Sequence, residues 1–187
     1  LFAYLSGSPF VFMKIYQVGE REYGWIFGLI AAGLIASSQL NNLLLRKYNS
    51  AQIFKTTLLV QTIIGFLLII GSGFNWLNLY TTILLIFLFL SCQGFSFPNS
   101  AALSLAPFTK EAGSASAMMG ALQMGFGSLA SALVGALSDG TALPMTAVMA
   151  GCTLVGFILL TIGRKRKAFT ARIEDVEEQA FEQIEHY

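Results

Sequence analysis

The sequence has little charge: Lys, Arg, Asp and Glu make up only 11% of its 187 residues, against roughly 25% in an ordinary soluble domain. Hydrophobic residues reach 55% and the mean hydropathy is +0.68. A soluble globular domain and a disordered chain are therefore nearly excluded. The net charge of +1 also leaves no strong field to attract nucleic acid, so no nucleic-acid partner is expected. The composition predicts a membrane protein with several spans.

Residues that usually carry metal or acid–base chemistry are also scarce. The two cysteines, Cys92 and Cys152, lie in apolar runs, and the one histidine, His186, is next to last. This pattern offers neither a disulfide framework nor a cysteine–histidine metal site. Every Asp and Glu falls in a predicted loop or in the tail, so no acid–base pair lies at membrane depth. We expect no metal, no cofactor and no enzymatic activity.

Six apolar stretches are long enough to span a bilayer, whose core requires about 20 residues of helix. The predicted fold class is therefore an all-α membrane protein with six transmembrane helices. We divide the chain into a six-helix bundle, residues 1–163, and a cytoplasmic tail, residues 164–187. The six predicted spans are Leu1 to Val18, Trp25 to Leu45, Thr56 to Gly73, Leu77 to Phe97, Ala112 to Leu137 and Leu143 to Ile162.

Basic residues gather on one side of these spans and predict that this side is cytoplasmic. They are Arg46, Lys47, Lys55, Lys110 and the run from Arg164 to Lys167. An even number of spans then places both ends of the segment in the cytoplasm. The tail turns acidic after its basic start; we interpret it as solvated, with a short amphipathic helix as the alternative. Leu1 opens inside an apolar stretch, so we expect the C-terminal part of a longer protein.

Small residues, amides and prolines stand out within the spans. Gln61, Gln93 and Gln123 must each bond across helices or line a cavity, because a lone amide is costly in lipid. Pro9 predicts a kink in the first span, and Pro98 predicts the end of the fourth. Rows of small residues predict close helix packing; they are Gly24, Gly28, Ala32 and Ala36, then Gly113, Ala117, Ala121 and Gly125, and finally Gly127, Ser131 and Gly135.

Several short blocks, taken together, resemble the C-terminal half of a major facilitator superfamily transporter of the bicyclomycin-resistance (Bcr/CflA) type. The resemblance covers the chain from Leu1 to about Lys167, and its last block is the most specific. The blocks are Tyr4 with Ser8-Pro9-Phe10, Asn41-Asn42 before Arg46-Lys47, Gln93-Gly94 before Pro98-Asn99, and Ala106-Pro107-Phe108 leading into Gly113-Ser114-Ala115-Ser116-Ala117 and Gln123.

The resemblance implies that the six spans are numbers seven to twelve of a twelve-helix fold, whose N-terminal six-helix half is a missing partner. It implies a bacterial inner-membrane antiporter that exports drug-like organic molecules, with protons as the coupling ion, by alternating access. The coupling acid would then lie in the other half. By analogy the central spans bind substrate, and the candidate residues are Tyr4, Ser8, Phe10, Phe89, Gln93 and Gln123.

Two other interpretations remain open from the sequence. A complete six-span protein could act as a homodimeric channel or exporter. A membrane scaffold or assembly subunit would show no transport phenotype at all.

Overall fold

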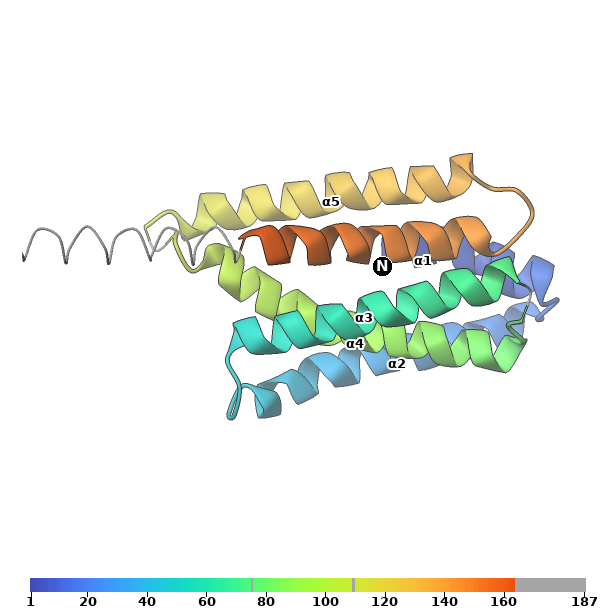
Figure 1. Cartoon of the computed structure of the whole chain (residues 1–187), viewed down its shortest axis with the longest axis horizontal. Coiled ribbons are helices and arrows are strands. Elements are labelled where there is room, and N and C mark those ends of the chain that lie inside the picture. Colours follow the sequence, from blue (N-terminus) through green and yellow to red (C-terminus); the bar gives the residue numbers. More distant parts are fainter. Residues whose placement is uncertain (75, 109, 164–187) are drawn as a thin grey trace, which may run out of the picture.

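The computed structural model describes residues 1–74, 76–108 and 110–163, which form helices joined by short loops without any strand (Figure 1). This confirms an all-α architecture. The predicted tail, residues 164–187, lies outside the described residues. The helices are α1 (Phe2–Pro9), the π-helix η1 (Phe10–Ile15), α2 (Glu20–Leu44), α3 (Ser50–Gly73), α4 (Leu79–Leu105), α5 (Ala112–Ala136) and a last helix, Leu143–Gly163.

Five of these helices are long and apolar enough to cross a membrane: α2, α3, α4, α5 and the last helix. The first predicted span, Leu1 to Val18, holds only the 8 residues of α1 and the 6 of η1. Together they are shorter than the about 20 residues that a bilayer core requires. By length and composition, the structure therefore supports five of the six predicted spans.

The helix boundaries follow local hydrogen bonds more than hydropathy. Asn49 accepts a hydrogen bond from the Gln52 amide through its side chain (2.9 Å), and the Gln52 side chain accepts one from the Asn49 amide (3.2 Å). This reciprocal cap starts α3 at Ser50 rather than at the predicted Thr56. The α3 helix therefore includes Lys55, whose long side chain can keep its charge at the interface.

The predictions for the two prolines have different outcomes. Directly after Pro9 the α-helix gives way to the π-helix η1, which closes where Gln17 takes a left-handed conformation with a φ of 53°. The prediction that Pro98 ends the fourth span is wrong, because α4 continues to Leu105. Beside this proline, the Asn99 side chain bonds to the carbonyl of Phe95 at 2.8 Å and supports the weakened turn.

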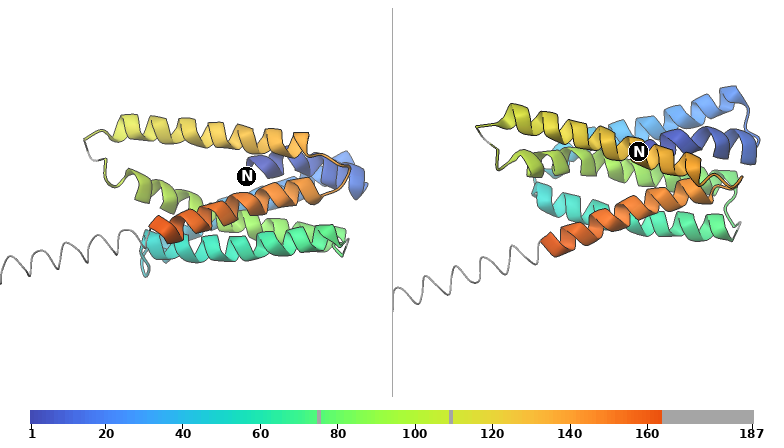
Figure 2. Two further views of the ribbon diagram at one scale, coloured as in Figure 1. Left: turned by 45° about the horizontal axis from the view of Figure 1, so that its top comes forward. Right: turned by 90° about the horizontal axis from the view of Figure 1, so that it is seen from above.

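The helices fall into two groups, as Figure 1 and Figure 2 show. In the first group, α4 packs against α2 and α3. In the second, α5 packs mainly on α1 and hardly touches α4. The last helix joins the groups, because Met145 lies against Gly7 of α1 and Ala150 lies against Gly65 of α3.

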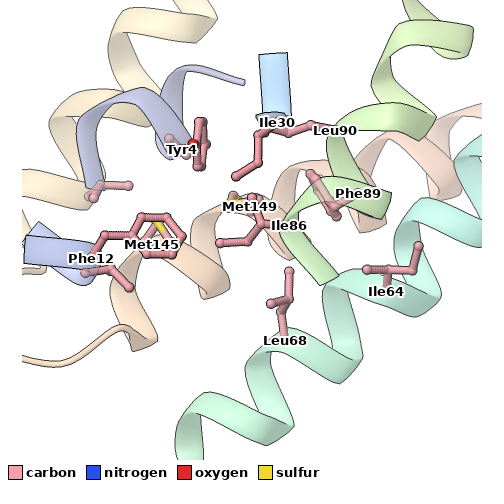
Figure 3. Packing of buried hydrophobic residues seen from close by; sticks show 13 residues of the cluster. Tyr4, Phe12, Ile30, Ile64, Leu68, Ile86, Phe89, Leu90, Met145 and Met149 are labelled. Carbon is pink, nitrogen blue, oxygen red and sulfur yellow. The ribbon is translucent and has the colours of Figure 1, made fainter. Parts of the chain in front are cut away.

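One apolar core runs through the bundle, and each helix contributes to it (Figure 3). At its centre the side chains of Phe12, Leu68, Ile86 and Leu90 are almost wholly buried. The closest approach of backbones lies between α2 and α4, where a Cβ added to Gly94 would meet the carbonyl oxygen of Leu34. A glycine at this point allows the two helices to pack without an intervening side chain.

The predicted rows of small residues have different outcomes. In α2 the prediction that the row starting at Gly24 packs closely is wrong within the described part of the chain, because no described atom lies within 4 Å of a Cβ added to Gly24 or Gly28. The helix instead packs on α4 through another face, formed by Ile30, Gly33, Ser37 and Asn41.

In α5 the row Gly113, Ala117, Ala121 and Gly125 is exposed and unpacked among the described residues. The second row does pack on α1. Gly127 meets the ring of Phe2, and the Ser131 hydroxyl donates to the Phe2 carbonyl at 3.1 Å.

Candidate functional site

Two of the six predicted site residues lie in an aromatic cluster between α1 and α2. Tyr4 is buried and its ring stacks on Phe27, with centroids 6.1 Å apart. Ser8 is also buried, and its hydroxyl shares a 2.9 Å hydrogen bond with that of Tyr23. The Tyr4 hydroxyl is buried without a hydrogen-bond partner among the described residues. The cluster is therefore closely packed, and the Tyr4 hydroxyl is its one buried polar group without a hydrogen bond among the described residues.

Two more predicted site residues, Phe89 and Gln93, lie where α4 packs against α3 and contact Gln61 of that helix. Gln61 donates from its Nε2 to the Gln93 Oε1 (2.9 Å) and to the Phe89 carbonyl (3.2 Å). A turn away, the hydroxyls of Thr57 and Ser96 share a hydrogen bond of 2.9 Å. For Gln61 and Gln93, the structure therefore favours the interhelical hydrogen bond over the cavity. Phe89 is buried in the core and is only 2% exposed.

Phe10 and Gln123 lie apart from these clusters and from each other. Phe10 is partly exposed on η1, beside a small cavity of about 110 Å³ that Val134 and Met145 also line. Gln123 is half-buried at about the middle of α5 and lines a larger groove. The structure thus brings the six residues together as two pairs and two separate side chains, not as a single pocket.

A groove of about 590 Å³ lies between the C-terminal end of α4 and the first half of α5. We call it the α4–α5 groove. Ligand pockets usually fall between about 300 and 1,000 Å³, so this groove has room for a drug-sized molecule. Its described lining is Ser104, Leu105, Phe108, Glu111, Ser114, Ala115, Met118, Met119, Leu122, Gln123 and Phe126.

The groove residues on α5 recur at three- and four-residue spacing, so they share one face of the helix. Of the six predicted site residues, only Gln123 lines this face. The sequence analysis missed Glu111, Met118 and Phe126, because it weighed the small residues of this span rather than the large ones. The signal in the sequence was the spacing of the large side chains: Met118, Leu122 and Phe126 recur every four residues and therefore share one face of the helix.

Acidic side chains in the described part of the chain lie at helix starts and in loops. Glu20 and Glu22 occupy the first turn of α2, and Glu111 is the N-cap of α5. Asp139 lies in the loop after α5, where the hydroxyl (2.6 Å) and amide (2.9 Å) of Thr141 donate to its carboxylate and lower its pKa. Glu20 and Glu22 thus lie at the start of a helix long enough to span a membrane, whereas Glu111 and Asp139 lie just outside the described helices.

The sequence is similar to those of two known bacterial proteins. Over 158 residues the chain is 29% identical to an uncharacterized MFS-type transporter, YdgK, of Bacillus subtilis. Over 158 residues it is also 23% identical to a bicyclomycin resistance protein homolog of Haemophilus influenzae. The chain is similar to major facilitator superfamily transporters. The resemblance drawn from the short blocks to transporters of this superfamily is confirmed.

The two alignments cover most of this chain but less than half of each relative. They include 83% and 84% of the chain, and 38% and 39% of the relatives' lengths. The chain therefore spans about two fifths of the curated relatives it matches. No family model matches the sequence, and no solved structure matches it.

Proposed function

We propose that this chain is the C-terminal six-helix half of a twelve-helix major facilitator transporter that exports small organic molecules by proton-coupled alternating access. The observation that carries the proposal is the similarity to a bicyclomycin resistance protein homolog over 84% of the chain. Under this proposal α1 with η1 forms the seventh span and the last helix the twelfth. The protein lies in the bacterial inner membrane, and both ends of the segment are cytoplasmic.

The packing of the helices supports a transporter with moving parts. The α5 helix leaves most of its surface uncovered, and only Val134 on it is buried. A helix of this kind needs either lipid or a further part of the protein against it. In the proposed fold, the missing N-terminal half covers one face of α5 and the substrate passes between the two halves.

Proton coupling needs an acid at membrane depth, and no carboxylate of the described residues lies in the middle of a helix. The described carboxylates lie in the first turn of α2, at the N-cap of α5 and in the loop after α5. The proposal therefore assigns the coupling acid to the N-terminal half. The described residues would bind substrate and rock with it, as expected of a transporter half rather than an enzyme.

An intact-mass measurement on the polypeptide from its native membrane tests the half-protein assignment. We expect roughly twice the 20.3 kDa of this chain, since the halves of such transporters are related repeats. A mass near 20.3 kDa would instead favour the six-span homodimeric channel or exporter.

A transport assay tests the function itself. Everted vesicles carrying the protein should accumulate a drug such as bicyclomycin when a proton gradient is imposed, and an uncoupler should abolish the accumulation. Gln93→Ala and Gln123→Ala should reduce this uptake at equal expression, whereas Ser128→Ala on the exposed side of α5 should leave it unchanged. Equal uptake with and without the gradient would contradict the proposed coupling.

A further inference from the structure

We propose that the acidic segment of this chain's own tail, residues 173–185, docks in a second groove, between the end of α2 and the start of α3. This groove has a volume of about 330 Å³, and we call it the α2–α3 groove. Its described lining is Leu44, Tyr48, Gln52, Ile53, Thr56 and Thr57. The inference goes beyond the proposed function, because it requires no assumption about what the protein transports.

Positive charge lies around the α2–α3 groove. Arg46 and Lys47 belong to the loop that supplies Tyr48, and Lys55 is next to Thr56 on α3. All three cationic side chains are exposed. None of the described lining residues is acidic, so the groove has a positive rim to which an acidic segment is complementary.

The walls of the groove offer apolar contact inside this rim. Ile53 is buried, Leu44 is half-buried, and Tyr48 is 52% exposed. The Thr57 hydroxyl already shares a 2.9 Å hydrogen bond with that of Ser96 on α4. An apolar helix face laid over these side chains would remove them from water, which is the common way in which a helix binds in a groove.

The tail sequence has the matching pattern. From residue 173 onward its charged side chains are all acidic, namely Glu174, Asp175, Glu177, Glu178, Glu182 and Glu185. Apolar residues recur between them at helical spacing and predict one apolar face; they are Ile173, Val176, Ala180, Phe181 and Ile184. The anionic surface of a membrane attracts basic amphipathic helices and repels acidic ones. A groove with a positive rim is therefore the better place for this apolar face.

The last helix brings the tail to the correct end of the bundle. A Cβ added to Gly65 would lie 2.9 Å from Ala150, and one added to Gly156 would lie 3.9 Å from Leu58. The last helix therefore runs antiparallel to α3, and it ends at Gly163 at the same end of the bundle as the loop between α2 and α3 (Figure 1). Residues 164–172 then separate this end from the acidic segment, and a spacer of this length reaches up to about 30 Å.

Disulfide cross-linking of the full-length protein in its native membrane tests the docking. In a background with Cys92→Ala and Cys152→Ala, Thr56→Cys in the groove should form a disulfide with Ala180→Cys in the tail. Trp76→Cys is the matched control, because Trp76 is 76% exposed but lies in the loop at the opposite end of α3. Cross-linking of Ala180→Cys to neither position, or equally to both, would overturn the proposal.

Charge reversal tests the complementarity. Arg46→Glu with Lys47→Glu should lower the rate of cross-linking about 3- to 10-fold, the effect of losing two exposed ion pairs. Glu177→Lys with Glu178→Lys should lower it to a similar extent, and all four changes together should restore most of the rate. Arg21→Glu at the other end of α2 is the control and should leave the rate unchanged. If the fourfold variant is slower than either double variant, the loop and the tail do not meet and the proposal fails.

An anionic lipid is the competing occupant of the positive rim. The cysteine variant is therefore reconstituted into vesicles of phosphatidylcholine alone and into vesicles that also contain phosphatidylglycerol. If the tail docks, Thr56→Cys and Ala180→Cys cross-link in both kinds of vesicle, because the partner is part of the chain. If lipid headgroups hold the rim instead, phosphatidylglycerol abolishes the disulfide, and the proposal is wrong.

Discussion

The helices α4 and α5 are similar in length and hydropathy, yet the bundle covers them very differently. Both are long and apolar enough to span a membrane. The α4 helix buries residues along its whole length, from Thr82 to Asn99, against α2 and α3. The α5 helix is far richer in glycine, alanine and serine, and buries only Val134. Small residues therefore permit close packing but do not bring it about; a partner surface is also needed.

The difference extends to the polar groups. The side chain of Asn99 on α4 donates to the Asn41 Oδ1 on α2 at 2.6 Å, and both residues are buried. Gln61 likewise connects α3 to α4. On α5 the side-chain hydrogen bonds to another described helix involve Ser131, near the end that contacts α1. The three helices α2, α3 and α4 thus form a connected unit, and α5 stands beside it.

The strongest test of this comparison adds one methyl group to a glycine on each helix. Gly94→Ala should destabilise the protein by about 2 to 3 kcal/mol, because the new Cβ meets the backbone carbonyl of Leu34, which cannot move without shifting α2. Gly125→Ala on α5 should be neutral or stabilising by up to about 1 kcal/mol, because nothing lies within 4 Å and alanine favours helix. Thermal unfolding of the detergent-solubilised protein gives both values.

Comparing Gly94→Ala with Gly125→Ala also tests whether another part of the protein covers α5. If Gly125→Ala is as damaging as Gly94→Ala in the protein from its native membrane, another part of the protein must pack closely on that row. The contrast between the two helices would then hold only for the described chain.

A second test addresses the amides. Replacing Asn41 by leucine leaves Asn99 without its partner on α2, and should cost about 1 to 2 kcal/mol. The double variant Asn41→Leu/Asn99→Leu should cost less than the sum of the single changes. Gln123→Leu on α5 should alter stability by less than about 0.5 kcal/mol, because its amide bonds to no other described residue. Strict additivity of the two asparagine changes would show that the hydrogen bond contributes little.

The sequence predicts the helical architecture well, because hydropathy and length are strong signals in a membrane protein. It predicts boundaries less well. The α4 helix continues past Pro98, and there the Asn99 side chain bonds to the Phe95 carbonyl and to Asn41, which is far away in sequence. The start of α3 depends on the reciprocal cap between Asn49 and Gln52, a local pattern that hydropathy averages away.

The candidate site is only partly predictable, because a groove depends on which helices diverge. Gln123 is a lone amide in an apolar span, and it lines the α4–α5 groove. Gln93 is also an amide in an apolar span, but it bonds to Gln61 on the neighbouring helix. Local sequence cannot separate these two outcomes, since each requires knowing what lies opposite the amide. Whether any of the six residues binds substrate stays a prediction.

A third test concerns the part of α5 that does have a partner. In Gly127→Ala the new Cβ would meet ring carbons of Phe2 at 2.5 to 2.8 Å. A ring at the end of a side chain can rotate away, so we expect a cost of about 1 kcal/mol or less, between the values for Gly94→Ala and Gly125→Ala. A cost as large as that of Gly94→Ala would mean that α1 and α5 are as firmly joined as α2 and α4.

The smallest expected effect lies in the loop that joins α5 to the last helix. Asp139 accepts two hydrogen bonds from Thr141, which hold the pKa of its carboxyl below the ordinary value of 3.8. A carboxyl with a lowered pKa stabilises the folded state above pH 3.8, and this contribution disappears as the pH falls through the folded-state value. Because the side chain is fully exposed, Asp139→Asn should lower the melting temperature only slightly at pH 7, and this effect should disappear as the pH falls through the folded-state pKa of the carboxyl. Thr141→Val, which removes the hydroxyl donor, should act in the same direction. If Asp139→Asn instead destabilises the protein as strongly as Gly127→Ala, this loop is part of what holds α5 in place, and the helix is less independent of the rest of the bundle than its open surface indicates.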